Sequence, residues 1–120
     1  MLRTGVDLIE VARIERAMQR YGERFFRRFF TEQERADCAG RAASLAARFA
    51  AKEAVAKALG TGIGQVRWVE IEIVAGPERR PELRLHGAAR ELAQALGLRE
   101  WSVSLSHTHE HAIAFVAAQA

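Results

Sequence analysis

The sequence predicts a small α+β domain, in which helices are segregated from a small antiparallel sheet. An alanine-rich stretch from Ser44 to Leu59 favours a helix that stops at Gly60. Near the C-terminus, residues 101–106 and 111–118 alternate apolar and polar side chains on either side of a short polar segment. Such alternation is typical of strands with one buried side, and the spacing predicts a β-hairpin.

The first third of the chain predicts one strand followed by helices. Residues 3–9 alternate like a strand, and residues 10–21 carry apolar side chains at helical spacings of three and four until Gly22. Thr31 and Glu34 have the spacing of a capping box at the start of a further helix. Before it stand four phenylalanines and two arginines: Phe25, Phe26, Arg27, Arg28, Phe29 and Phe30.

The middle of the chain predicts a loop, two strands and a helix. In chain order, these are a loop at 61–64, a one-side-buried strand at 66–74, a turn between Gly76-Pro77 and Pro81, a strand with Leu83 and Leu85, and a helix at 87–96 ended by Gly97.

Length and composition fit one domain over residues 1–120 that works in the cytoplasm. Apolar residues make up 49% of the chain, which suits a packed core without disulfide bonds. Cys38 is the only cysteine, which favours a reducing compartment and argues against a zinc site of clustered thiolates. The N-terminal residues, with Asp7 and Glu10, do not resemble a signal peptide, and no run approaches the ~20 apolar residues of a membrane span. We therefore expect no membrane partner.

Basic residues are concentrated in the first half of the chain. The formal net charge is +3, and residues 13–57 hold eleven basic and six acidic residues. This concentration fits a docking face for an acidic partner, and it equally fits a solvated helical surface.

One face of the predicted alanine-rich helix is apolar except for two charged residues. Ala46, Phe49 and Ala50 share this face with Glu53 and Lys57, because all five recur at spacings of three and four. A carboxylate rarely lies on such a face without a partner or a metal ion. Glu53 is therefore either a metal ligand or the partner of Lys57 in an exposed ion pair, and the pattern leaves both interpretations open.

Rare residue types point to the same helix. The chain contains sixteen arginines but only two lysines, Lys52 and Lys57, and both fall on this helix. A retained lysine indicates a need for a compact ammonium, for which phosphate groups are a common reason. Asp7 is one of two aspartates against thirteen glutamates. A short carboxylate near Gly5, where backbone can pass closely, suits magnesium.

Five motifs follow one another along nearly the whole chain. They are Gly5-Val6-Asp7-Leu8-Ile9-Glu10, Phe30-Thr31-x-x-Glu34, the block from Arg48 to Gly60 with Thr61-Gly62, Pro81-x-Leu83-x-Leu85-x-Gly87, and Ser104-Leu105-Ser106-His107. Together they resemble the holo-acyl-carrier-protein synthase family of phosphopantetheinyl transferases, in its single-unit type. The combination of Gly-x-Asp with Lys-Glu-Ala-x-x-Lys-Ala at this spacing is quite specific.

The resemblance implies an enzyme that transfers the 4′-phosphopantetheine arm of coenzyme A to a serine of apo-acyl-carrier protein. Release of 3′,5′-ADP and a role in fatty acid biosynthesis follow from the same resemblance. It implies that Asp7 and Glu53 bind Mg²⁺, which bridges the coenzyme's pyrophosphate, and that Lys57 neutralises developing phosphate charge. These three are the implied catalytic residues. The implied coenzyme A contacts are Arg48, Lys52, Lys57, His107 and Thr108.

This implied site is chemically coherent. Two carboxylates suffice for Mg²⁺ when substrate phosphates and water complete an octahedral shell. The cation and a lysine can stabilise the charge on phosphoryl oxygens during in-line attack. No residue is an unambiguous general base, and we expect water held by Glu53 or by the metal in that role. The resemblance also implies a homotrimer in which a neighbour's residues complete the site.

The resemblance implies an acidic carrier protein as the partner, and the first helix is the expected docking surface. Arg13, Arg16 and Arg20 are spaced three and four apart, which aligns them on one face. Arg24 and Arg28 extend this basic surface. Arg13 follows the Gly5–Glu10 motif at the family's spacing, which implies a position close to the metal.

Other interpretations use different residues. His107, His109 and His111 would share a face if they continued one strand, which allows a zinc site. Arg27 and Arg28 among phenylalanines superficially resemble a nucleic-acid surface, but the i,i+4 spacing of those phenylalanines favours packing, and we expect no nucleic-acid partner. A non-catalytic interaction domain and a broader-specificity transferase for peptidyl carrier domains remain as further alternatives. Transferases of the latter type are typically longer, as two fused copies of this unit.

Overall fold

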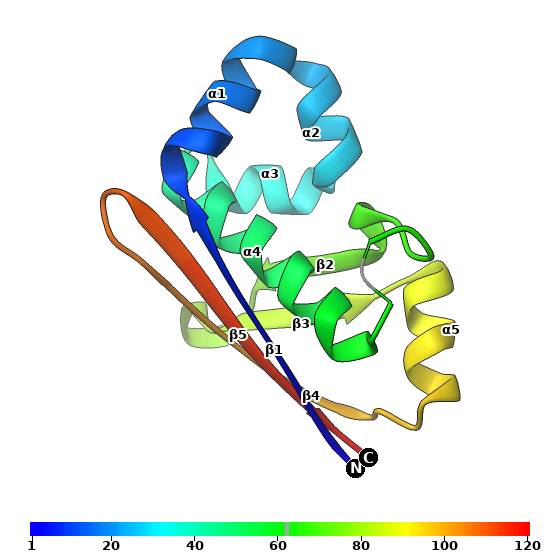
Figure 1. Ribbon diagram of the computed structural model, residues 1–120. Coiled ribbons are helices and arrows are strands. Elements are labelled where there is room, and N and C mark those ends of the chain that lie inside the picture. Colours follow the sequence, from blue (N-terminus) through cyan, green and yellow to red (C-terminus); the bar gives the residue numbers. More distant parts are fainter. Residues whose placement is uncertain (62) are drawn as a thin grey trace.

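The computed structural model describes residues 1–61 and 63–120 and arranges them around a central helix, α4 (Ala42–Leu59). Figure 1 shows this helix between a three-stranded sheet on one side and a two-stranded sheet on the other. Both sheets are antiparallel, and the predicted α+β class is confirmed. Gly62, which falls in a predicted loop and in one of the motifs, lies outside the described residues.

The larger sheet has the order β1-β5-β4. Its strands are β1 (Leu2–Glu10), β4 (Glu100–His107) and β5 (His111–Gln119), so the predicted C-terminal hairpin is confirmed. The inner face of the sheet packs on α4 through small side chains, among them Ala114 and Val116. On the outer face, apolar side chains of β1 and β5 are exposed.

Strand β1 approaches α4 very closely because position 5 is glycine. A Cβ atom on Gly5 would lie 1.9 Å from the carbonyl oxygen of Ala54. Nearby, the Arg3 guanidinium donates to the carbonyl oxygens of Ala58 and Leu59 at 3.2 and 3.3 Å, where α4 ends. These contacts fix the position of β1 along α4. Asp7 projects from the same strand face as Gly5, so it also faces α4.

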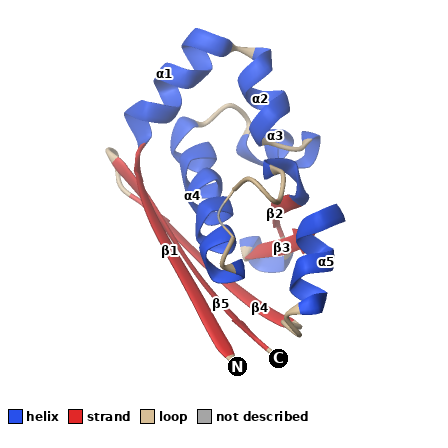
Figure 2. Cartoon of the chain, turned by 45° about the vertical axis from the view of Figure 1, so that its right-hand side comes forward, coloured by secondary structure: helices blue, strands red, loops and turns tan. Residues whose placement is uncertain are grey.

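Three short helices cover one end of α4: α1 (Val11–Tyr21), α2 (Glu23–Phe29) and α3 (Glu32–Cys38). Figure 2 shows them grouped away from the end of the molecule where both termini lie. Gly22, with φ +54°, separates the first two helices as the sequence predicts. The capping box of α3 is also confirmed, since Thr31 Oγ1 accepts from Glu34 N and Glu34 Oε1 accepts from Thr31 N.

The phenylalanines around α2 form an aromatic core rather than an exposed basic surface. Phe25 and Phe30 are buried, with their ring centroids 5.6 Å apart. The Phe29 ring contacts those of Phe49 and Trp68, which stack on each other at 4.6 Å. Packing therefore accounts for the aromatic residues that suggested a nucleic-acid surface.

The smaller sheet pairs β2 (Ile71–Ala75) with β3 (Pro81–Leu85) and leads into α5 (Gly87–Ala95). The strand predicted over 66–74 is partly wrong, because its residues Trp68–Glu70 form a 3-10 turn. The Glu70 carboxylate accepts from Arg67 N and from Ala88 N, which ties this turn to the start of α5.

The predicted one-sided burial of this strand is also wrong. Glu72 is only 8% exposed, although the alternation places it on the solvent side. Its carboxylate accepts from Thr31 Oγ1 at 2.6 Å and contacts His86 Nε2 at 3.0 Å. Although burial disfavours its charge, these hydrogen bonds hold the pKa of Glu72 below its usual value.

Cys38 is buried, and burial raises the pKa of its thiol to about 11, so the side chain acts as a small apolar core group. No helix in the described part of the chain has the length and apolar content to cross a membrane.

Candidate active site

Asp7 and Lys57 meet where β1 crosses the C-terminal half of α4. The Lys57 ammonium donates to Asp7 Oδ1 at 3.1 Å and to the carbonyl oxygen of Val6 at 2.8 Å. The Lys57 side chain is 53% exposed and that of Asp7 is 20% exposed, so a ligand can reach this ion pair. Such an exposed pair contributes little stability, about 0–1 kcal/mol.

Glu53 lies one helical turn before Lys57, on the same side of α4. Burial raises the pKa of Glu53, and the negative charge of Asp7 raises it further. Lys57 and Arg13 act in the opposite direction. The structure thus brings the four predicted residues Asp7, Arg13, Glu53 and Lys57 together. The alternative of an isolated Glu53–Lys57 ion pair is wrong, because the ammonium binds Asp7 instead.

The two carboxylates fit a hard divalent cation. They carry like charge on facing elements, and a cation between them would relieve the repulsion that raises the pKa of Glu53. Within residues 1–61 and 63–120, no group of three or more histidine, cysteine, aspartate or glutamate side chains could hold a metal ion. Asp7 and Glu53 would fit Mg²⁺ if each supplied a carboxylate oxygen and phosphates and water completed the shell.

His107 and Thr108 lie at the tip of the β4–β5 hairpin and are exposed. Val11 N donates to the carbonyl oxygen of Glu110 at 2.8 Å, which places this tip beside the first turn of α1. The histidines do not continue one strand, so the alternative of a shared face for a zinc site does not hold. His107 stands opposite Ala112 and shares its inner face, whereas His111 belongs to the alternate, outer face.

Arg48 lies on the other side of α4. Its Nε donates to the carbonyl oxygen of Ile73 on β2 at 3.2 Å. Since residues five apart on a helix are roughly 140° apart around its axis, Arg48 and Glu53 face different sheets. The structure does not bring Arg48 to the carboxylates within one chain.

The structure contradicts the prediction that Lys52 contacts coenzyme A. Its side chain has no exposed surface, and its ammonium donates to Glu34 Oε1, to the carbonyl oxygen of Trp68 and to that of Ile71. Burial lowers the pKa of Lys52, and the adjacent Glu34 carboxylate opposes this shift. The predicted contact between Lys52 and coenzyme A is therefore wrong, because all three donors of the ammonium are occupied inside the core.

The five arginines predicted to dock a carrier are all exposed on α1 and α2. They line shallow hollows on this surface: Arg13 and Arg16 next to Leu8, Arg16 and Arg20 next to Ala17, and Arg24 and Arg28 next to Phe25. Exposed arginines beside these hollows give a basic surface that can attract an acidic partner.

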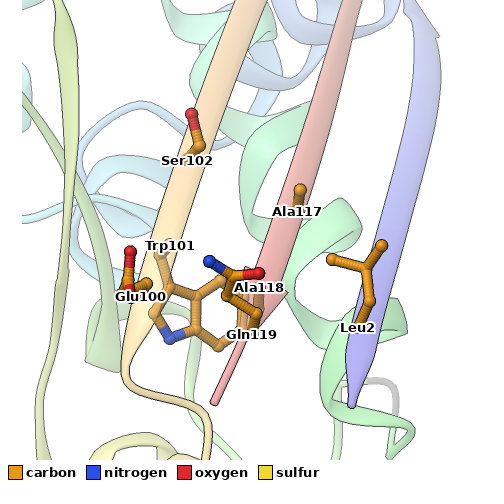
Figure 3. Close-up of a pocket in the computed structure, with 7 residues that line it drawn as sticks. All are labelled: Leu2, Glu100, Trp101, Ser102, Ala117, Ala118 and Gln119. Carbon is orange, nitrogen blue, oxygen red and sulfur yellow. The ribbon is translucent and has the colours of Figure 1, made fainter.

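A further hollow lies at the far end of the larger sheet. Figure 3 shows its lining, with Trp101 and Gln119 near Leu2. It contains none of the predicted site residues and lies near the chain termini, whereas Asp7 is midway along β1. The site chemistry is therefore separate from this hollow.

The polar network behind the site could not be predicted from the sequence. Glu34, Glu72 and His86 form buried or half-buried contacts that connect α3, β2 and the start of α5. Of these residues, only Glu34 belongs to a motif that can be recognised in the sequence, the capping box. That motif accounts for a hydrogen bond to one of its two carboxylate oxygens, Oε1. The other oxygen accepts from Ile73 N, a partner distant in sequence.

Fold and site together define a class of transferase. The chain belongs to the 4′-phosphopantetheinyl transferase superfamily, whose sequence profile matches residues 3–116. It is 57% identical to the holo-[acyl-carrier-protein] synthase of Herpetosiphon aurantiacus, over 97% of each chain. It is 51% identical to that of Chloroflexus aurantiacus, over all of this chain and 99% of the relative. The family resemblance seen in the motifs is confirmed.

Solved structures of the same family share the fold. The holo-[acyl-carrier-protein] synthase of Helicobacter pylori in complex with coenzyme A superposes with a TM-score of 0.89 at 33% identity, over 97% of this chain and 99% of that one. The synthase of Neisseria meningitidis gives 0.89 at 34% identity, over 98% of both chains.

The raised pKa of Glu53 predicts a stability cost at the site. The fold favours the protonated carboxyl, so its contribution is present below the ordinary glutamate pKa of 4.5 and lost as pH rises through the raised value. Glu53→Gln should therefore raise the melting temperature of metal-free protein at neutral pH by a few degrees, and this gain should vanish below pH 4.5. Thermal denaturation in chelator measures the melting temperatures at neutral pH and below pH 4.5, with exposed Glu15→Gln as the control. An equal gain at both pH values would contradict the assignment.

Proposed function

We propose that this protein transfers the 4′-phosphopantetheine arm of coenzyme A to a serine hydroxyl of apo-acyl-carrier protein and releases 3′,5′-ADP. The observation that carries this proposal is the cluster of Asp7, Glu53 and Lys57 in a chain 57% identical, over 97% of its length, to a holo-[acyl-carrier-protein] synthase. The coenzyme A complex of the Helicobacter pylori relative supports the choice of donor.

The catalytic roles divide between two carboxylates and one ammonium. Asp7 and Glu53 would hold Mg²⁺, which supplies positive charge to the coenzyme's phosphate oxygens. Lys57 is held at the carbonyl oxygen of Val6, so its charge is fixed at the mouth of the site before substrate arrives. A fixed ammonium stabilises the charge that develops on phosphoryl oxygens during in-line attack. A water hydrogen-bonded to Glu53, or held by the cation when it is bound, would accept the serine proton.

The proposed coenzyme contacts lie on two different parts of the chain. His107 and Thr108 lie at the exposed hairpin tip beside the start of α1 and remain proposed contacts for the coenzyme. Arg48 also remains a proposed contact, but it faces β2, on the side of α4 away from Asp7. We infer that one coenzyme meets the carboxylates of one subunit and Arg48 of its neighbour.

The outer face of the larger sheet supports assembly with further copies. Val6 and Leu8 on β1 are 49% and 63% exposed, and Ile113 and Phe115 on β5 are 40% and 46% exposed. The register places Val6 opposite Phe115 and Leu8 opposite Ile113, so the four side chains form one apolar patch. Such patches mark interfaces. The proposed assembly is a closed cyclic homotrimer, the arrangement that the family resemblance implies.

The arginine surface of α1 and α2 is the proposed docking site for the carrier. The proposed setting is the cytoplasm, in support of fatty acid biosynthesis, and the buried thiol of Cys38 suits that compartment.

Metal dependence tests the function directly. Apo-carrier incubated with coenzyme A, Mg²⁺ and this protein should gain phosphopantetheine, seen by mass spectrometry, and a chelator should stop the reaction. Asp7→Asn and Glu53→Gln should each lower the rate by at least about 10-fold, because an amide binds Mg²⁺ poorly. Glu15→Gln, on the exposed side of α1, is the matched control and should keep the parent's rate. Full turnover by metal-stripped protein in chelator would refute the metal site.

Charge reversal tests the docking surface. Arg20→Glu should raise the KM for carrier by about tenfold, because it places like charges together, while the KM for coenzyme A stays unchanged. Arg13→Glu should raise the carrier KM as well, but it should also lower kcat because Arg13 lies close to Glu53. Arg90→Glu, exposed on α5, is the control. A carrier KM that is indifferent both to Arg20→Glu and to salt would place docking elsewhere.

The outer sheet face predicts the oligomeric state. Light scattering should report a trimer for the parent, and Val6→Lys combined with Phe115→Lys should give a monomer, because two charges then interrupt the patch. The monomer should lose transfer activity if a neighbour supplies Arg48. Tyr21→Lys, an equally exposed position on α1, should leave the trimer intact. A fully active parent monomer at assay concentration would rule out the shared site.

A further inference from the structure

The largest fully buried side chain of the described residues is a charged one, Lys52. Its ammonium lies 2.8 Å from Glu34 Oε1, 3.0 Å from the carbonyl oxygen of Trp68 and 2.6 Å from that of Ile71. The Phe30 ring covers it at 5.6 Å. A lysine ammonium has three donors, and all three are used.

Its partner Glu34 is equally enclosed and equally saturated. Oε1 accepts from Lys52 and from Thr31 N, and Oε2 accepts from Ile73 N at 2.9 Å. The pair therefore joins α3, α4, the 3-10 turn at Trp68 and β2. Each bond has a defined direction, so together they permit one orientation of the Lys52 side chain and of the helix that carries it.

Helix α4 needs such a directional contact because its apolar surface does not specify its rotation. Twelve of its eighteen residues are buried, and these twelve together lie around nearly the whole circumference. Seven of them are alanines, most of which lie on one side of the helix. Burial is non-directional, so a helix that is apolar on all sides gains nearly the same burial at several angles about its axis. Small methyl groups also interlock weakly with neighbouring elements.

We propose that the Glu34–Lys52 pair is a positioning pair that fixes the rotation of α4 about its axis and so aims Glu53 at Asp7. Lys52, Glu53 and Ala54 are consecutive. On one side Lys52 is held by three acceptors, and on another the Ala54 carbonyl rests against Gly5 of β1. Any rotation that frees Lys52 moves Glu53 by the same angle. This inference rests on the proposed role of Glu53 as a metal ligand.

A merely structural role predicts something different. Burying two charges is expensive, and apolar or neutral replacements of a whole buried pair are often harmless to stability. If the pair only filled the core, replacing both partners together would leave the site unchanged. If it positions α4, the site should suffer even when the fold survives.

The test replaces both partners and compares the result with a matched core change. The double variant Glu34→Gln/Lys52→Met removes both charges and keeps an acceptor for Thr31 N or Ile73 N. Val55→Ala, fully buried on the same helix, is the control that loosens packing and leaves the polar contacts intact. Calorimetric titration with Mg²⁺ alone, steady-state kinetics and amide exchange are measured well below each melting temperature.

The double variant should lose about 10-fold or more in both Mg²⁺ affinity and kcat, with an unchanged KM for carrier, as typical for residues that orient a ligand. Val55→Ala should stay within about two-fold of the parent in both. Amide exchange should accelerate along residues 53–59 in the double variant and not in the control. Parent-like Mg²⁺ affinity and kcat in the folded double variant would overturn the inference.

Two further arms keep the outcome decisive. If the double variant does not fold, Glu34→Gln/Lys52→Gln, which also removes both charges but keeps a side-chain donor at position 52, should show a smaller loss of Mg²⁺ affinity in the same direction; parent-like affinity would overturn the inference. If the parent protein binds Mg²⁺ but transfers no phosphopantetheine, the proposed function fails, and the calorimetric comparison still decides whether the pair positions Glu53.

Discussion

The close contact between Gly5 of β1 and the Ala54 carbonyl of α4 is the constraint on which the site depends. Any larger residue would push the strand from the helix, because its Cβ would lie 1.9 Å from that oxygen. Strand and helix supply the two carboxylates, Asp7 and Glu53, from separate parts of the chain. Their separation is therefore set by backbone contact rather than by flexible side chains. Gly5 has an ordinary backbone conformation, so the site requires its missing Cβ rather than its conformational freedom.

The same contact brings like charges together. The fold raises the pKa of Glu53 through burial and through Asp7, so the site without its cation is electrostatically unfavourable. Lys57 offsets part of this cost while remaining half exposed at the mouth. Such strain is typical of functional sites, where stability is traded for a ligand that restores balance on binding. A divalent cation between the two carboxylates would relieve their repulsion.

Much of the fold could be predicted because its signals are local. The capping box of Thr31 and Glu34, the helix end at Gly60 and the C-terminal hairpin depend on residues a few positions apart. The strand predicted over 66–74 failed for a nonlocal reason. Alternation assumes one solvated face, but α3 and α4 enclose β2, and Thr31 and His86 provide partners that allow a carboxylate at Glu72 to be buried.

The two lysines of α4 show what the sequence could and could not predict about the candidate site. The rarity of lysine drew attention to α4, where Lys57 places an exposed ammonium beside Asp7. For Lys52 the same signal had a different cause. Its compact ammonium is retained to meet three acceptors in a space closed to solvent, and sequence composition cannot distinguish a phosphate from a buried carboxylate as the partner.

The opposite orientations of the charged residues on α4 have a consequence for assembly. Glu53 and Lys57 face β1, whereas Arg48 faces β2, with the helix itself between them. A helix with its side chains is about 10 Å thick, so one coenzyme can reach both sets only by passing around it or by lying between two subunits. The exposed apolar patch on β1 and β5 lies on the far face of the sheet that carries Asp7. In the proposed assembly, a neighbour that covered this patch would leave the carboxylates on the opposite, inner face of the sheet uncovered.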